Sequence, residues 1–465
     1  MILAVDQGTT GTTCLVVDEE LRPRGRGYRE LGQHFPQPGW VEHDLEEIWA
    51  TVVGAAEDAV RAARVAPREL RAIAITNQRE TTALWERGTG RPVARAIVWQ
   101  DRRTADRCRE LPADLIRERT GLVPDPYFSA TKLEWLLART AASDLAFGTV
   151  DSWLVWKLTG GRVHATDRTN AARTMLLGLD SLDWDGELLG LFGIDQSVLP
   201  RLVGSAEVVA EADFLGVTLP IAGIAGDQQA ALAGHGCFTR GEAKATYGTG
   251  SFVLVHEGDE RMQAPGGLLE TVAAPHGYAL EGAVLASGAA IQWLRDGLGL
   301  IAEAAESETL ARSVDSAGGV CFVPALTGLG SPHWDADARG LVTGITRGTT
   351  RAHLVRAALE AIAFQVADVV DSIPGGVSVL RADGGASANA FLMQFQADVL
   401  GCRVEVAAER ETTAIGAAVL AGLATGLWDE DTVRGLLRVG TTYEPSGVET
   451  RRDDWRLAVR RALLR

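Results

Sequence analysis

Residues 2–18 read Ile2-Leu3-Ala4-Val5-Asp6-Gln7-Gly8-Thr9-Thr10-Gly11-Thr12-Thr13-Cys14-Leu15-Val16-Val17-Asp18, and the architecture of the whole chain can be worked out from them. An apolar run at residues 2–5 and a second at residues 13–18 flank a turn rich in Gly and Thr at residues 7–12. Two short apolar runs joined by such a turn predict a β-hairpin.

The same pattern recurs at residues 243–256, where Gly248-Thr249 occupies the place of Gly8-Thr9. A helical 3.6-residue period starts after Asp44 in the first half and covers Leu354 to Val370 in the second. Strands that alternate with helices in both halves predict a duplicated α/β architecture. We place the boundary in the Gly-rich stretch at residues 234–241, which gives domains of residues 1–236 and 237–465.

The composition excludes several classes of function. The 465 residues are enough for two cores, and a formal charge of −16 without any Lys/Arg run disfavours nucleic acid and anionic membranes as partners. The five cysteines are scattered and form no metal-binding or disulfide pattern. No apolar stretch has the length of a signal peptide core or a membrane span, so we expect a cytoplasmic protein without integral membrane association.

The first turn contains the groups that a nucleotide triphosphate requires. Glycine lets backbone N–H groups approach phosphate oxygens, and the hydroxyls of Thr9 and Thr10 add donors. Asp6 ends a buried strand, where a carboxylate needs a cation, and Mg²⁺ is the expected one beside phosphates. An ordinary hairpin turn with a satisfied Asp is the alternative.

Two further turns favour the phosphate interpretation. Gly248-Thr249-Gly250 is the second, and Asp383-Gly384-Gly385 is the third, which follows a strand and is expected to open a helix carrying Phe391 and Phe395. Amides at a helix N-terminus favour anions. The chain contains neither a P-loop motif nor a Gly-x-Gly-x-x-Gly after a strand, which disfavours a P-loop enzyme and a Rossmann dehydrogenase.

Asp227 is the candidate general base for phosphorylation of an alcohol. It follows an apolar run broken by glycines at residues 221–226 and precedes Gln228 and Gln229. A carboxylate within hydrogen-bond reach of the acceptor hydroxyl can take its proton. The alternative is that Asp227 only caps a helix over residues 228–232.

Arg79 and Glu80 are candidates for binding the acceptor. They follow a strand at residues 71–75 and offer donors and an acceptor side by side, which suits neighbouring hydroxyls of a short polyol. Trp99 ends another apolar run and can pack on the carbon face of such a substrate. The alternatives are a surface ion pair for Arg79-Glu80 and a core position for Trp99.

Together these segments resemble the FGGY family of carbohydrate kinases, within the superfamily of actin, hexokinase and Hsp70-like proteins. The matching motifs run through nearly the whole chain and lie at residues 6–10, 33–44, 76–82, 99–103, 151–154, 226–229 and 383–386. The combination of residues 77–82 with residues 34–44 is similar to that of the members that phosphorylate glycerol. The resemblance implies two duplicated ribonuclease H-like (actin-like ATPase) domains with a cleft between them.

The resemblance also implies the reaction, which is ATP-dependent and Mg²⁺-dependent phosphorylation of glycerol to sn-glycerol 3-phosphate with Asp227 as general base. The implied metal site consists of Asp6 and Asp227. The implied glycerol contacts are Arg79, Glu80, Trp99, Tyr127, Asp227, Gln228 and Phe252. The implied nucleotide contacts are Thr9, Thr10, Gly11, Thr249, Gly288, Gln292, Gly385 and Asn389. A homodimer and a homotetramer are both compatible with the resemblance.

The chain departs from the family pattern in three places. Thr13 stands where the family usually has an arginine, which puts one basic contact to ATP in doubt. The segment Glu207 to Leu219 lacks the basic loop with which some members bind a sugar bisphosphate inhibitor. The Arg-rich tail from Ser446 to Arg465 matches nothing that we can assign.

Three alternative functions remain open from the sequence. The first is a family kinase for a pentulose, gluconate or erythritol, which Arg79-Glu80 and Trp99 disfavour because a longer sugar needs more room and more polar partners. The second is a non-catalytic ATP-binding switch on the same fold, which would show no glycerol-dependent ADP release. The third is a NAD-dependent polyol dehydrogenase, which would respond to NAD and not to ATP.

Overall fold

The hairpin predicted at the start of the chain forms the centre of the first sheet. In the computed structural model, which describes residues 1–464, β1 (Ile2–Gln7) pairs antiparallel with β2 (Gly11–Val17). The strands extend further into the predicted turn than expected, so the turn is only residues 8–10. Ile2, Leu3 and Ala4 are fully buried, because this sheet is covered on both faces.

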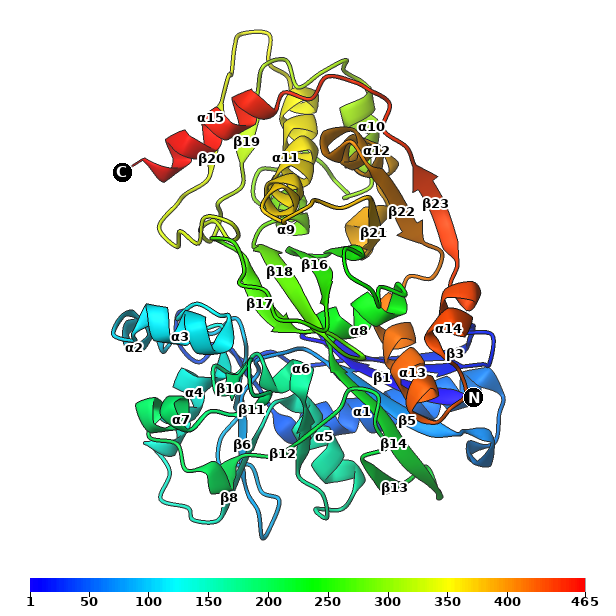
Figure 1. Ribbon diagram of the computed structural model, residues 1–465. Coiled ribbons are helices and arrows are strands. Elements are labelled where there is room, and N and C mark those ends of the chain that lie inside the picture. Colours follow the sequence, from blue (N-terminus) through cyan, green and yellow to red (C-terminus); the bar gives the residue numbers. More distant parts are fainter. Residues whose placement is uncertain (465) are drawn as a thin grey trace.

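Two sheets with the same strand arrangement form the two cores (Figure 1). The first has the order β13-β14-β5-β1-β2-β3, and the second has the order β17-β18-β16-β15-β21-β22-β23. In the first sheet three antiparallel strands are followed by two parallel strands and an antiparallel edge strand. The second sheet repeats this arrangement with one additional antiparallel strand, β17, at its other edge. The predicted duplication is therefore confirmed.

The remaining strands of the first sheet are β3 (Pro23–Glu30), β5 (Ala72–Asn77), β13 (Ala210–Phe214) and β14 (Val217–Gly226). Those of the second sheet are β15 (Ala243–Tyr247), β16 (Ser251–Gly258), β17 (Leu269–Val272), β18 (Tyr278–Val284), β21 (Val379–Asp383), β22 (Arg403–Ala407) and β23 (Val439–Tyr443). β21 leads directly into the third turn, as expected from the sequence.

Helix α1 (Leu45–Ala63) forms where the 3.6-residue period predicts it. Asp44 Oδ1 accepts hydrogen bonds from the backbone N–H groups of Glu46 and Glu47, which caps the helix. The helix lies against β3 with almost no space between the backbones, since a Cβ atom at Gly27 would come within 2.0 Å of the Ala55 carbonyl oxygen. Helix α11 (Arg351–Asp371) covers the second sheet and begins three residues earlier than expected.

Small elements inserted between β5 and β13 form a lateral part of the first domain, at the lower left of Figure 1. They are the helices α2 (Ala105–Arg109), α3 (Ala113–Thr120), α4 (Ser129–Leu137), α5 (Val150–Leu158), α6 (Arg168–Ala171) and α7 (Gly186–Phe192), with short strands that include β6 (Ala83–Glu86), β8 (Leu145–Gly148) and β10 (Leu177–Gly178). This part carries Tyr127 and Arg173 of the site described below.

The two halves meet through a pair of corresponding helices. Helix α8 (Asp227–Gly234) follows β14, and α13 (Thr412–Ala424) follows β22. A Cβ atom at Gly416 would lie 1.7 Å from the Ala230 carbonyl oxygen, so the helices touch through their backbones. α13 also packs on the first sheet, in one apolar cluster with Ile2 and Ala74. The division of the chain near residue 236 stays a prediction.

The segment at residues 207–219 and the Arg-rich tail both have structural roles. Residues 207–219 contain most of the β13–β14 edge hairpin of the first sheet. The Arg-rich tail includes α15 (Arg452–Leu463), whose Trp455 is buried and whose Arg452 forms an ion pair with Asp368 of α11 at 2.9 Å.

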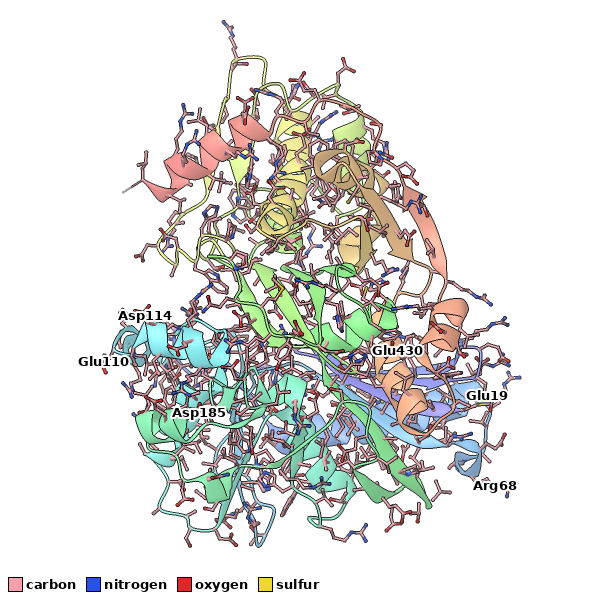
Figure 2. All side chains as sticks on the ribbon, in the orientation of Figure 1. Glu19, Arg68, Glu110, Asp114, Asp185 and Glu430 are labelled. Carbon is pink, nitrogen blue, oxygen red and sulfur yellow. The ribbon has the colours of Figure 1, made fainter. Side chains whose placement is uncertain are left out.

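Charged side chains such as Glu19, Arg68, Glu110 and Asp114 are exposed and lie at the periphery of the molecule (Figure 2). Within residues 1–464, no helix is both long and apolar enough to cross a membrane.

Two buried carboxylates of the lateral part predict a pH-dependent stability. Asp151 of α5 accepts a hydrogen bond from Thr166 Oγ1 at 2.7 Å, and its burial together with the nearby Asp167 charge raises its pKa to about 7. Because this pKa is higher than in the unfolded chain, the proton on Asp151 stabilises the fold at low pH and this contribution is lost as the pH rises through 7.

In wild type the free energy of unfolding should fall between pH 5 and 8, and we expect this fall to be smaller in Asp151→Asn. The difference corresponds to about 1.4 kcal/mol for each unit by which the pKa of Asp151 is raised. Urea denaturation at a series of pH values measures this difference. Asp114→Asn, at an exposed position on α3, is the matched control and should leave the profile unchanged. Parallel profiles for wild type and Asp151→Asn would contradict the assignment.

Candidate functional site

Hydrogen bonds within the first Gly/Thr turn and from the Gln78 side chain hold this turn in place. Gly8 N donates to the Gly11 carbonyl at 2.9 Å, and the buried Gln78 side chain donates to Gln7 Oε1 and to the Gly8 carbonyl at 3.1 and 3.3 Å. Thr10 is exposed and Thr9 is partly exposed, so both can reach a ligand. Gly11 has a packing role, because a Cβ atom there would lie 2.5 Å from the Arg29 carbonyl oxygen.

The turns of the second domain lie against one another. Gly248 N donates to the Gly250 carbonyl at 2.9 Å, as in the first turn, and Gly288 N donates to the Gly248 carbonyl at 3.0 Å. Gly288 begins α9 (Gly288–Asp296), which places that helix N-terminus on the turn. Gly384 has a φ of +86°, and a Cβ atom there would lie 2.6 Å from the Tyr247 carbonyl oxygen. The second and third turns therefore form one surface, which leaves Thr249, Gln292 and Gly385 exposed.

The helix expected directly after Asp383-Gly384-Gly385 begins later. A short 3-10 turn, η3 (Gly385–Ala388), follows, and α12 (Ala390–Leu400) starts after it. Asn389 caps α12, since its Oδ1 accepts from Leu392 N at 3.0 Å, and its Nδ2 donates to Ser307 Oγ at 3.2 Å. The expectation that Gly384 and Gly385 lie at the N-terminus of that helix was wrong, because the left-handed Gly384 turns the chain first.

Asp6 and Asp227 lie close together where the strands β1 and β14 end. Burial raises the pKa of Asp6 well above its usual range, and the charges of Asp227 and Glu411 raise it further. Asp227 is the first residue of α8, with Gly226 in the cap position, so the alternative that Asp227 only caps the helix is wrong. Its side chain is 33% exposed and accepts a hydrogen bond from Gln228 N at 2.8 Å.

This pair fits Mg²⁺ shared with phosphates. Carboxylate oxygens are the protein ligands that Mg²⁺ prefers, and a cation between them would remove the repulsion that Asp6 experiences. Within residues 1–464 there is no group of three or more His, Cys, Asp or Glu side chains that could hold a metal ion. The remaining ligands would thus be phosphate oxygens and water, as is usual for Mg²⁺.

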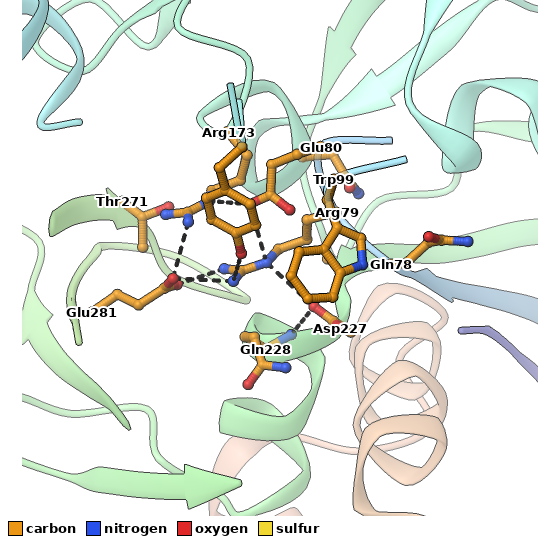
Figure 3. Close-up of polar contacts among 12 residues, drawn as sticks. Gln78, Arg79, Glu80, Trp99, Arg173, Asp227, Gln228, Thr271 and Glu281 are labelled. Atoms are coloured by element: carbon orange, nitrogen blue, oxygen red, sulfur yellow. Dashed lines mark hydrogen bonds and ion pairs between the residues drawn. The ribbon is translucent and has the colours of Figure 1, made fainter. Parts of the chain in front are cut away.

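Arg79 and Glu80 are buried, each 2% exposed, so the alternative of a surface ion pair is wrong. Arg79 Nε lies 3.2 Å from Asp227 Oδ1, and Arg79 Nη2 donates to the Tyr127 hydroxyl at 3.4 Å (Figure 3). Gly226 makes room for this arrangement, because a Cβ atom there would lie 2.6 Å from Arg79 Cδ. Glu80 has a φ of +61°, an uncommon conformation for a residue other than glycine and one that clusters at functional sites.

Aromatic side chains border the same site. Trp99 and Tyr127 pack edge to face with ring centroids 5.6 Å apart. Trp99 is partly exposed, and its Nε1 donates to Thr9 Oγ1 at 2.9 Å. This hydrogen bond connects the candidate acceptor residues with the first phosphate turn. Phe252 is paired with Ala283 on β18 and is also partly exposed, on the sheet face that carries Glu281.

Three buried charged residues of this region were not predicted. They are Arg173, Lys244 and Glu281, each 0% exposed. Glu281 is ionised, since the neighbouring Arg173 and Arg79 overcome its burial and lower its pKa to about 2. Lys244 Nζ contacts Gln228 Oε1 and donates to Thr246 Oγ1 at 2.9 Å, and burial lowers its pKa to about 8. A charged residue inside an apolar strand, as in residues 279–284, is the signal that could have found Glu281.

Comparisons with known proteins show to which family the chain belongs. Residues 1–234 match the N-terminal domain of the FGGY family of carbohydrate kinases, and residues 243–425 match its C-terminal domain. Glycerol kinase 2 of Thermotoga maritima is 50% identical over 99% of this chain and 98% of the relative, and the glycerol kinase of Dechloromonas aromatica is 51% identical over 99% and 97%.

Among solved structures, Plasmodium falciparum glycerol kinase with ADP superposes with a TM-score of 0.91 at 34% identity, covering 100% of this chain and 98% of that one. A protein of Brucella ovis described as a xyloylose kinase superposes with a TM-score of 0.87 at 27% identity, covering 99% and 97%. The resemblance noted in the sequence is confirmed, and the chain belongs to the FGGY family of carbohydrate kinases.

Proposed function

We propose that this chain transfers the γ-phosphoryl group of ATP to a terminal hydroxyl of glycerol and releases ADP and sn-glycerol 3-phosphate. The proposal depends most on one observation, which is that the acceptor residues Arg79 and Trp99 are in direct contact with Asp227 and with the first phosphate turn. Trp99 Nε1 donates to Thr9 Oγ1 at 2.9 Å, and Arg79 Nε lies 3.2 Å from Asp227 Oδ1. The high identity to glycerol kinases supports the choice of acceptor.

The residues of this site divide into two groups. Arg79, Glu80, Tyr127 and Gln228 would bind the glycerol hydroxyls, and Trp99 and Phe252 would contact its carbons. Thr9, Thr10, Gly11, Thr249, Gly288, Gln292, Gly385 and Asn389 would contact the nucleotide. The cytoplasmic location stays a prediction, as does the homodimer or homotetramer.

Asp227 would act as the general base. It is the first residue of α8, where the positive end of the helix dipole favours a carboxylate. As the oxygen of glycerol attacks the γ-phosphorus, the bond from that phosphorus to the bridging oxygen of ADP breaks, and the hydroxyl proton moves to an Asp227 carboxylate oxygen. Arg79 keeps this carboxylate oriented through its Nε, 3.2 Å away.

Burial of the acceptor residues protects the reaction from hydrolysis. Arg79 and Glu80 are shielded by β18 and by the lateral part of the first domain, so water has little access to these two side chains. Mg²⁺, held by Asp6 and Asp227 with the phosphates, would neutralise the charge that develops on the transferred group.

A coupled assay of ADP release tests the proposal. We expect Mg²⁺-dependent ADP release with glycerol, with a kcat/KM at least about tenfold higher than with erythritol, xylulose or gluconate, because added carbons and hydroxyls do not fit a site built for a short polyol. Dihydroxyacetone has the same three carbons, with a carbonyl in place of the central hydroxyl, and tests whether that hydroxyl is recognised. Equal or higher values for xylulose or gluconate would favour a sugar kinase instead. Release of ADP that no acceptor stimulates would contradict both.

A further inference from the structure

Two arginines and two glutamates form a closed ring of alternating charges beside the acceptor site (Figure 3). Glu281 Oε2 and Oε1 accept from Arg79 Nη1 and Nη2 at 2.6 and 3.1 Å, and Glu281 Oε1 also accepts from Arg173 Nη2 at 2.9 Å. Arg173 Nε donates to Glu80 Oε1 at 2.7 Å, and Arg79 Nε lies 3.7 Å from the same oxygen. Every member of the ring is at most 2% exposed.

The ring connects the two domains. Arg79, Glu80 and Arg173 belong to the first domain, whereas Glu281 lies on β18 of the second sheet. Glu281 accepts hydrogen bonds from both terminal nitrogens of the Arg79 guanidinium, and this bidentate geometry fixes the plane of the group. Arg173 holds Glu80 through a single hydrogen bond from its Nε, at 2.7 Å. Two of the side chains proposed to bind glycerol hydroxyls are thus oriented by Glu281 of the opposite domain, Arg79 directly and Glu80 through Arg173.

The strand that carries Glu281 also leads to the nucleotide turns. β18 ends at Val284, and Gly288 follows four residues later with its N–H bonded to the Gly248 carbonyl at 3.0 Å. Ser287 Oγ is bonded to Ser251 Oγ at 2.7 Å, at the start of β16. A shift of the second domain when nucleotide binds or leaves would therefore either open the ring or carry Arg79 along with Glu281.

We propose that Glu281 is a positioning residue of the acceptor site, which holds Arg79 and, through Arg173, Glu80 in the geometry that binds the polyol. The affinity for the acceptor then depends on the position of the second domain. Because the second domain carries nucleotide turns, this affinity also depends on whether nucleotide is bound. This inference rests on the proposed phosphorylation of glycerol. Glu281 itself does not touch the reacting atoms.

The first test is a steady-state comparison of Glu281→Gln with wild type. The amide keeps the shape but loses the charge and one of the two acceptor oxygens. We expect the KM for glycerol to rise about 10–100-fold, as for loss of a hydrogen bond to a charged group, with the KM for ATP within about twofold and kcat reduced less than about tenfold. An unchanged KM for glycerol in a variant with lowered Tm would reduce Glu281 to a structural role and overturn the proposal.

Glu270→Gln is the matched control. Glu270 lies on the adjacent strand β17, is buried, and accepts from Arg261 Nε at 2.7 Å, but it makes no contact with Arg79 or Glu80. This variant weakens the ion pair of a buried glutamate of the same sheet with the partly buried Arg261, and its KM for glycerol should stay at the wild-type value. An equal rise of KM in Glu270→Gln and Glu281→Gln would mean that general damage to the sheet is responsible, and would overturn the proposal.

The second test measures coupling between the ligands by calorimetry. We expect the Kd of glycerol to differ between free and ADP-saturated wild type, and the ratio to approach one in Glu281→Gln. A ratio that the variant retains would overturn the proposed coupling. If Glu281→Gln does not fold, Glu281→Asp decides, because it keeps the charge at a shorter reach: a raised KM for glycerol supports the proposal and an unchanged one overturns it. Wild type without glycerol-dependent ADP release would instead refute the proposed function.

Discussion

Replacing Asp227 with Asn is expected to lower kcat about 10²–10⁴-fold, the usual contribution of a general base. The amide can still accept from Gln228 N through its Oδ1, which Asp227 does at 2.8 Å, and Arg79 Nε can still donate to it. Binding geometry is thus kept while the proton acceptor is lost. Initial rates at saturating ATP measure the effect, with the KM for glycerol expected to change less than kcat.

The control for this variant is Asp213→Asn. Asp213 lies on the edge strand β13 of the same domain, where its carboxylate accepts from Thr218 Oγ1 at 2.7 Å, at the opposite end of β14 from Asp227. Its kcat should equal that of wild type. Near-normal turnover of Asp227→Asn would show that another group takes the proton, and the base would then have to be sought elsewhere in the site.

Replacing Arg79 with Ala is expected to have the largest combined effect. Arg79 lies within ion-pair distance of Glu281, Glu80 and Asp227, so its removal leaves three carboxylates without their shared cation in a buried region. Loss of one partner of a buried ion pair costs about 3–5 kcal/mol of the free energy of unfolding. We also expect the KM for glycerol to rise at least about 100-fold, because direct contacts are lost as well.

Urea denaturation and initial rates separate these two effects. Arg79→Lys should recover part of the stability and little of the glycerol affinity, since a lysine keeps the charge but not the planar fork. Arg119→Ala removes an exposed pair with Glu187, at 2.7 Å, and should cost less than about 1 kcal/mol. A wild-type KM for glycerol in Arg79→Ala would exclude Arg79 from the acceptor site.

Much of the fold could be predicted because the relevant signals are local. The hairpin at residues 2–18 and its counterpart at residues 243–256 show alternation of apolar runs and Gly/Thr turns, and α1 shows both a cap at Asp44 and a regular period. The element boundaries were less predictable. The η3 turn intervenes before α12 because Gly384 adopts a left-handed conformation, and a Gly-Gly pair does not reveal which conformation it will adopt.

The site was predictable where a polar or aromatic residue follows an apolar run, and less so elsewhere. Arg79, Glu80, Trp99 and Asp227 could be selected because each ends an apolar run, and the structure brings them together. Arg173 and Glu281 were missed, because their partners are 93 and 202 residues away along the chain. A buried charge in a strand indicates that some partner exists, but the identity of that partner depends on how the domains meet.

The packing of α13 on the first sheet has a consequence for synthesis on the ribosome. α13 starts at Thr412, long after the first sheet is completed by β14 at Gly226, yet it shares an apolar cluster with Ile2 and Ala74 of that sheet. At about 5–20 residues per second, the nascent first domain must keep this face uncovered for about 10–40 s. During that interval the chain presents an apolar surface typical of chaperone substrates, and a translation pause before residue 412 would lengthen its exposure to aggregation.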